Sequence, residues 1–136
     1  MWKIARAEGA DLDIDEVYRV YESSGLGERR PLAEPGRLGS MIRNANLILV
    51  CRIDEEMVGI ARSVSDFSYV TYLSDIAVSQ PYQRWGIGRA LIDATRKEAP
   101  QAKIVLLSAP AAAEYYPHIG FSRHNSAWVL NPQDAP

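Results

Sequence analysis

Two glycines separated by one residue stand where the chain passes from an apolar run into a helical pattern. They lie in the segment Gln83–Gly88, whose sequence is QRWGIG. Glycine loses more backbone entropy on ordering than any other residue, so a pair of glycines at a helix start requires an explanation. The first turn of a helix has unpaired N–H groups, which favour an anion that approaches the backbone closely. The alternative is that the glycines only allow the helix to pack tightly on a strand.

Two common phosphate-binding motifs do not account for this segment. A P-loop requires the pattern G-x-x-x-x-G-K-[ST], which the chain lacks. The dinucleotide-binding fingerprint G-x-G-x-x-G requires a third glycine at the position of Leu91. If the glycines bind an anion, they therefore do so in a turn of another kind.

The elements that must position this turn alternate between strand and helix. Apolar periodicity, capping residues and turn residues predict the order β-α-α-β-β-β-α-β-α-β. The glycine turn then joins a central strand, which ends at Val78, to a helix that Pro100 stops. The predicted strands are 2–7, 47–53, 58–65, 69–78, 104–107 and 127–130; the predicted helices run from Asp13 or Asp15 to Gly25, around 38–42, from the glycines to Pro100, and over 111–116.

Composition limits the kinds of partner. The chain has 136 residues, of which 47% are hydrophobic and 24% charged, values ordinary for a soluble globular protein. We expect a single domain over residues 1–136. No stretch approaches the roughly 18 apolar residues of a membrane span, and the first residues lack the apolar run of a signal peptide, which predicts a cytoplasmic protein. The net charge of -2 gives no basic footprint for nucleic acid.

The few residues suited to metal binding or thiol chemistry are poorly placed for it. Cys51 is the single cysteine and stands in the apolar run 47–51, which favours a buried structural thiol over a nucleophile. His118 and His124 are the only histidines, and neither has cysteine or carboxylate neighbours at ligand spacing. We therefore predict no metal site.

Two motifs in the right order resemble one family. The segment Gln83–Gly88 fits the Q/R-x-x-G-x-G/A signature of the GNAT superfamily of N-acetyltransferases, and it follows the end of the central strand at the interval which that family shows. Residues 112–121, AAEYYPHIGF, resemble the family segment A-x-x-x-Y-x-x-x-G-F, with Tyr116 at the tyrosine. One departure is Ala109, where many relatives carry an asparagine that contacts the coenzyme.

The resemblance implies a fold and an activity. The fold would be the α/β (α+β) fold of the acyl-CoA N-acyltransferases, a mixed central β-sheet of six to seven strands flanked by about four helices. The activity would be transfer of the acetyl group of acetyl-CoA, as co-substrate, to a primary amine that attacks directly in a ternary complex. The implied acceptor is a small-molecule or peptide amine, with no nucleic acid or membrane as partner, and dimers are frequent in the family.

The resemblance also implies where the coenzyme binds. Backbone amides at the helix start would hold its pyrophosphate, assisted by the guanidinium groups of Arg84 and Arg89. Those arginines could equally form a solvated helix face. An N–H near Val78 would polarise the thioester carbonyl. The full set of predicted coenzyme-binding residues is Ile76, Ala77, Val78, Gln83, Arg84, Trp85, Gly86, Ile87, Gly88, Arg89 and Tyr115.

Two residues are the candidates for moving protons. By its motif position, Tyr116 would be the acid that protonates the departing thiolate, whereas Tyr115 would pack or border the coenzyme. Asp75 precedes the coenzyme-binding strand end and could act as base through water or bind the charge of the amine. The alternatives are that Tyr116 is a core aromatic and that Asp75 is a structural carboxylate hydrogen-bonded to loop amides. Ser74 or Tyr72 could line the amine site instead.

Other functions are compatible with the same fold. The chain could be a catalytically silent module that binds CoA as a sensor, although it keeps both Tyr116 and the glycine signature. It could also modify RNA or protein, as toxin-like transferases do. The acceptor would be gripped by the loop Gly25–Leu32, whose mixed charge permits an amine that bears a carboxylate.

Overall fold

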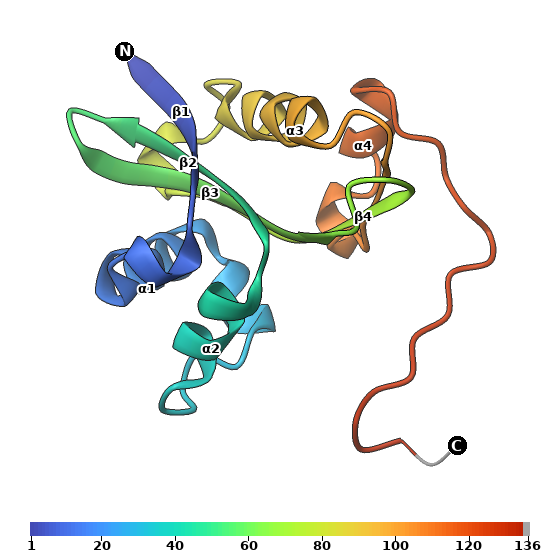
Figure 1. Ribbon diagram of the computed structural model, residues 1–136, viewed down its shortest axis with the longest axis horizontal. Helices are drawn as coiled ribbons and strands as arrows, with labels where there is room; N and C mark the ends of the chain where they lie inside the picture. The colour runs from blue at the N-terminus through green and yellow to red at the C-terminus, as the bar shows by residue number, and fades with distance from the viewer. Residues whose placement is uncertain (135–136) are drawn as a thin grey trace.

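A five-stranded mixed β-sheet forms the centre of the computed structural model, which describes residues 1–134 (Figure 1). The strands lie in chain order, β1-β2-β3-β4-β5. Neighbours among the first four strands are antiparallel, whereas β5 runs parallel to β4. The bounds are β1 (Trp2–Ala7), β2 (Leu47–Ile53), β3 (Glu56–Ser65), β4 (Val70–Val78) and β5 (Lys103–Val105); the helices are α1 (Ile14–Ser24), α2 (Arg37–Asn44), α3 (Ile87–Glu98) and α4 (Tyr115–His118).

The helices cover both faces of the sheet, so that the protein has two apolar cores (Figure 1). On one face, α1 and α2 bury Val17, Tyr21 and Ile42 against alternate residues of the central strands. On the other face, α3 buries Ile87 and Leu91 against the remaining residues of those strands. Since successive side chains of a strand point to opposite faces, each central strand contributes to both cores. Cys51 is fully buried in the second core, as predicted.

Local signals in the sequence fix most of the boundaries. The Oδ1 atom of Asp13 accepts a hydrogen bond from the N–H of Asp15 and caps α1, and Gly25 ends this helix with a φ of +90°. The predicted hairpin between β2 and β3 is confirmed. It turns at Asp54 and Glu55, whose φ values of +48° and +71° are of the sign that a two-residue hairpin favours.

Strand β4 separates from β5 partway along its length. It pairs with β3 between Thr71 and Val78, but it pairs with β5 only from Val70 to Tyr72. The pairing with β3 also contains a bulge, because Arg62 lies opposite Asp75 and Ser63 lies opposite Leu73, which leaves Ser74 without a partner residue. The bulge turns Asp75 towards Tyr21 of α1. The second half of β4 is open on the other edge because β5 ends at Val105.

The strand count differs from the six to seven expected, although the fold class is confirmed. Within residues 1–134 there are five strands, and the strand predicted over 127–130 is absent. That segment lies in the extended chain after α4, where Trp128 is 91% exposed (Figure 1). Its apolar residues suit a strand, but no neighbouring strand pairs with their backbone groups, so propensity alone does not make one. The predicted helix 111–116 is also displaced, because α4 spans Tyr115–His118 and a short 3-10 turn precedes it.

Candidate active site

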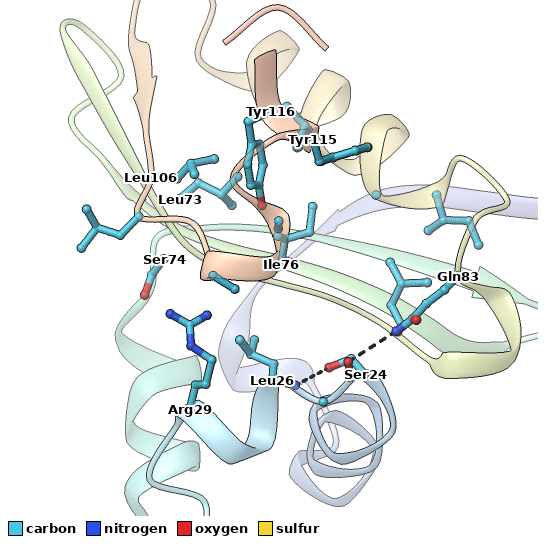
Figure 2. A pocket seen from close by; sticks show the side chains of 18 of the residues that line it. Ser24, Leu26, Arg29, Leu73, Ser74, Ile76, Gln83, Leu106, Tyr115 and Tyr116 are labelled. Atoms are coloured by element: carbon cyan, nitrogen blue, oxygen red, sulfur yellow. Dashed lines mark hydrogen bonds between the residues drawn. The ribbon is translucent and has the colours of Figure 1, made fainter. Parts of the chain in front are cut away.

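A pocket of about 640 Å³ opens where β4 leaves β5 (Figure 2). Its floor is formed by side chains of β4, including Leu73 and Ile76. The glycine turn before α3 lines one end, the loop after α1 lines another side, and the segment with Tyr115 and Tyr116 lies across from that loop. The pocket thus joins segments that are far apart in the sequence.

The glycine turn leaves open space beside its backbone. Gly86 stands immediately before α3 with a φ of +86°, and no side chain caps the start of the helix. A Cβ atom added at Gly86 would meet nothing within 4 Å, and one at Gly88 would meet only Cδ1 of Ile76, at 4.0 Å. Close helix packing does not explain these two glycines. The glycine that does permit α3 to pack on the sheet is Gly59, where an added Cβ would lie 3.2 Å from atoms of Ile87 and Leu91.

The structure brings most, but not all, of the predicted coenzyme-binding residues to the pocket. Ala77 points into the core beneath α1 instead, and Arg89 is exposed on α3. Trp85 is 55% exposed and packs edge-to-face on Tyr82, with ring centroids 5.1 Å apart. Those that line the pocket are Ile76, Val78, Gln83, Arg84, Gly86, Ile87, Gly88 and Tyr115.

Gln83 ties the glycine turn to the end of the central strand. Its Nε2 atom donates a hydrogen bond of 2.9 Å to the carbonyl oxygen of Val78 and a longer one, of 3.4 Å, to that of Ser24. These bonds connect the ends of β4 and α1 to the chain that enters α3. Figure 2 shows the bond between Gln83 and Ser24. A glutamine at this position therefore fixes where the turn lies relative to the pocket.

Tyr116 points into the pocket towards Ile76 (Figure 2). Its ring is held edge-to-face between Tyr115 and Phe121, with centroid distances of 5.4 Å to each. Burial raises the pKa of the Tyr116 phenol above its usual value, Tyr115 raises it further, and the charge of Arg29 opposes this rise. The phenol is therefore protonated at neutral pH and has a proton to give.

Asp75 does not line the pocket. Its side chain is completely buried and accepts hydrogen bonds from Nε of Arg30, Nε of Arg62 and the hydroxyl of Tyr21. Burial alone would raise the pKa of Asp75, but the hydrogen bond and charge of Arg62, together with Tyr21 and Arg30, hold it below its usual value. A carboxylate stabilised in this way is a weak base and has no side open to a substrate. The geometry therefore favours a structural role for Asp75, although its partners are arginines and a tyrosine and not the loop amides expected.

The residues around Asp75 escaped prediction from the sequence. Arg62 also donates to Oγ of Ser74 at 2.9 Å, and Arg30 donates to the carbonyl oxygens of Ser74 and Arg29 at 2.8 and 2.9 Å. The sequence offered Ser74 or Tyr72 as residues that could line the amine site. Ser74 lines the pocket, whereas Tyr72 does not. The only sequence signal for this network was the adjacent pair Arg29 and Arg30 in the loop already suspected of gripping the acceptor.

Comparison with known proteins agrees with the two motifs and the fold. The sequence model of the family described as "Acetyltransferase (GNAT) domain" matches residues 20–131. A GNAT-family acetyltransferase from Streptococcus pneumoniae TIGR4 has a TM-score of 0.74 at 19% identity, over 96% of this chain and 98% of that one. An aminoglycoside N-acetyltransferase solved in complex with CoA has a TM-score of 0.72 at 12% identity, over 98% and 96% of the two chains.

Curated relatives are similar in sequence but longer. A histone acetyltransferase from Glycine max is 24% identical over 133 residues, which cover 88% of this chain and 56% of the relative. A probable acetyltransferase from the same plant is 23% identical over 133 residues, which cover 88% of this chain and 52% of the relative. The chain thus spans about half the length of the curated relatives it matches.

In the part of the chain that the structure describes, no helix has the length and apolar character needed to cross a membrane, and no group of three or more potential metal ligands gathers.

Proposed function

Since this chain belongs to the GNAT acetyltransferase family, we propose that it binds acetyl-CoA along β4 and transfers the acetyl group to a primary amine. The observation that carries the proposal is the continuity of the pocket. It runs from the uncapped start of α3, past the open half of β4, to Tyr116. The proposal treats residues 1–136 as a single catalytic domain.

The residues present fit the coenzyme at three points. The amides at Gly86–Gly88 start a twelve-residue helix and have open space before them, which suits a pyrophosphate. Arg84 lines the same end of the pocket and would add a charge-assisted bond. Beyond Tyr72, β4 has no pairing with β5, so its backbone groups are available to a peptide-like arm. A volume of about 640 Å³ lies within the usual range of ligand pockets.

The chain's own groups would then act on the thioester that bound acetyl-CoA supplies. Ile76 and Val78 lie in the open half of β4 and line the pocket, so a backbone N–H near Val78 is the candidate donor to the thioester carbonyl oxygen. Donation there stabilises the negative charge that develops on this oxygen as the amine attacks. Direct attack needs no enzyme nucleophile, which agrees with the burial of Cys51 in the core.

Protons would move at two places. The phenol of Tyr116 would give its proton to the leaving sulfur, because it points into the pocket and is protonated at neutral pH. Asp75 is fully bonded beneath β4 and would not take the proton of the ammonium substrate. We assign that proton to water, which reaches the pocket from its open side.

Calorimetry on acetyl-CoA tests the coenzyme site. Replacing Gly88 with leucine places a side chain in the space assigned to the pyrophosphate, and we expect the affinity to fall at least tenfold in a folded variant. Unchanged affinity would refute the site. Thiol release with a panel of amines then distinguishes a transferase from a CoA-binding sensor, because a sensor would bind the coenzyme and release no thiol in the presence of any amine.

A further inference from the structure

The pocket that the proposed function assigns to catalysis is lined by positive and not by negative side chains. Arg29, Arg30 and Arg84 line it, and none of the described residues that line it is aspartate or glutamate. The carboxylate of Asp75, the residue after the pocket-lining Ser74, is enclosed by Arg30 and Arg62. Two guanidinium groups face one carboxylate there, so this network adds positive charge on that side.

Arg84 and Arg29 stand at different ends of the pocket. Arg84 belongs to the glycine turn, where the coenzyme pyrophosphate would account for its charge. Arg29 belongs to the loop after α1, and its guanidinium points into the pocket between Leu26 and Ser74 (Figure 2). Within residues 1–134, Arg29 forms no salt bridge, whereas Arg30 and Arg62 both do.

The backbone of Arg29 is fixed in place by its neighbour. Arg30 donates from Nη1 to the carbonyl oxygen of Arg29 at 2.9 Å, from Nη2 to that of Ser74 at 2.8 Å, and from Nε to Asp75 at 2.6 Å. The bonds to Ser74 and Asp75 anchor the loop to the bulge of β4, and the bond to Arg29 fixes its carbonyl within the loop. Arg29 is thus presented on an anchored backbone, on the side of the pocket that faces Tyr116 (Figure 2).

We propose that the acceptor is an amine that also carries a carboxylate, and that Arg29 binds this carboxylate. The inference rests on the proposed function and adds the chemical class of its acceptor. Arginine suits this role because its planar guanidinium pairs with both oxygens of a carboxylate. Three leucines that line the same pocket, Leu26, Leu73 and Leu106, supply apolar surface for the rest of the molecule (Figure 2). An apolar α-amino acid has all three features: amine, carboxylate and apolar side chain.

A polycationic acceptor fits this pocket poorly. Each additional ammonium group would meet arginines and no carboxylate, and like charges at short range repel. The acceptor's own reacting amine is tolerated because it must lose its proton before it attacks. The charge of the lining therefore discriminates between acceptors of similar size.

Matched amines test the proposal on the wild-type chain. The probes are L-leucine, L-leucinamide, isopentylamine and spermidine, with thiol release from acetyl-CoA as the readout. We expect kcat/KM for L-leucine to exceed that for L-leucinamide and isopentylamine at least about tenfold, since a charge-assisted pair contributes that much or more. The amine of L-leucinamide is less basic than that of L-leucine, so a larger fraction of it is deprotonated at neutral pH. The supply of free amine alone would therefore favour L-leucinamide. Spermidine should be the poorest acceptor.

Two arginine variants distinguish binding of the acceptor from binding of the coenzyme. Replacing Arg29 with methionine should lower the preference for L-leucine over isopentylamine at least about tenfold, mainly through KM, and Arg29→Lys should restore part of it. Arg84→Met is the matched control, because it should weaken acetyl-CoA binding and leave that preference as it is. Circular dichroism confirms folding, which the exposed position of both side chains favours.

The outcomes distinguish this proposal from the proposed function. Binding of acetyl-CoA with equal or better turnover of isopentylamine or spermidine would overturn the carboxylate acceptor and leave the transferase. Binding of acetyl-CoA without any turnover of L-leucine, and without calorimetric binding of L-leucine to the CoA-saturated protein, would also overturn it. Failure to bind acetyl-CoA would instead overturn the proposed function.

Discussion

The Oδ1 atom of Asp75 lies 2.6 Å from Nε of Arg30, 45 residues away in the chain. This pair connects the bulged strand β4 to the loop after α1, and the carboxylate also accepts hydrogen bonds from Arg62, Tyr21 and Oγ of Ser74. A carboxylate expected at the reaction centre thus lies one layer beneath the pocket. Its position makes it a residue that holds the loop after α1, and this role gives tests whose outcomes differ from those for a catalytic base.

Replacing Asp75 with asparagine should destabilise the protein strongly. The variant leaves Arg30 and Arg62 charged and mostly buried without a carboxylate, and breaking such a pair costs about 3 kcal/mol or more. Urea denaturation at pH 7 measures the free energy of unfolding. Asp93→Asn makes the same chemical change at an exposed position of α3 and should shift it by less than about 0.5 kcal/mol. A normal stability for Asp75→Asn with a large loss of kcat would restore the role of base.

The same carboxylate should make stability fall in acid. The pKa of Asp75 is lower in the folded protein than its usual value, so the unfolded chain takes up a proton first as the pH decreases. The stabilisation is complete above the unfolded pKa of about 3.9 and is lost as the pH falls from there through the lower folded value. Urea midpoints between pH 5 and pH 2 should therefore drop more steeply for wild type than for Asp75→Asn. Parallel curves for the two proteins would contradict this assignment.

The sequence predicted those parts of the fold that depend on local signals. The cap of Asp13 and the left-handed Gly25 delimit α1, and the apolar run of β2 has the predicted bounds. The order of the elements up to α4 followed from the same patterns. The strand predicted over 127–130 was wrong, because a strand requires a pairing partner and the apolar sequence of this segment does not show whether one is present.

The site was predictable only where a motif is continuous in sequence. The glycine turn and Tyr116 belong to short motifs, and both line the pocket. The surroundings of Asp75 depend on a bulge at Ser74 and on arginines 13 and 45 residues away, and neither leaves a periodic trace. A regular strand would place Ser74 and Asp75 on opposite faces, but the bulge interrupts the alternation. Arg62 donates to both side chains, and Oγ of Ser74 donates to Oδ1 of Asp75 at 3.3 Å.

The two glycines of the turn should respond to alanine in opposite ways. Gly88 lies in the first turn of α3 and has room for a Cβ atom, so Gly88→Ala should stabilise the apo protein by about 0.5 kcal/mol. The family signature accepts alanine at this position, so this variant should still bind acetyl-CoA. Gly86 has a φ of +86°, which an alanine adopts at a cost of about 1–2 kcal/mol, so Gly86→Ala should destabilise it. Thermal melting with and without acetyl-CoA checks both signs. A Gly88→Ala protein less stable than wild type would contradict the open space beside this glycine.

Tyr116 and Tyr115 provide a matched pair for the acid step. The change Tyr116→Phe keeps the ring between Tyr115 and Phe121 but removes the only proton it could give, so acetyl-CoA affinity should hardly change. The value of kcat should fall at least about tenfold, since general acids contribute about 100- to 10,000-fold and water replaces them only in part. Tyr115→Phe should keep most of its turnover, because a ring that only packs tolerates the loss of its oxygen. Steady-state thiol release by folded variants measures kcat for both tyrosine changes. Equal kcat for wild type and Tyr116→Phe would mean that Tyr116 is structural and that water is the acid.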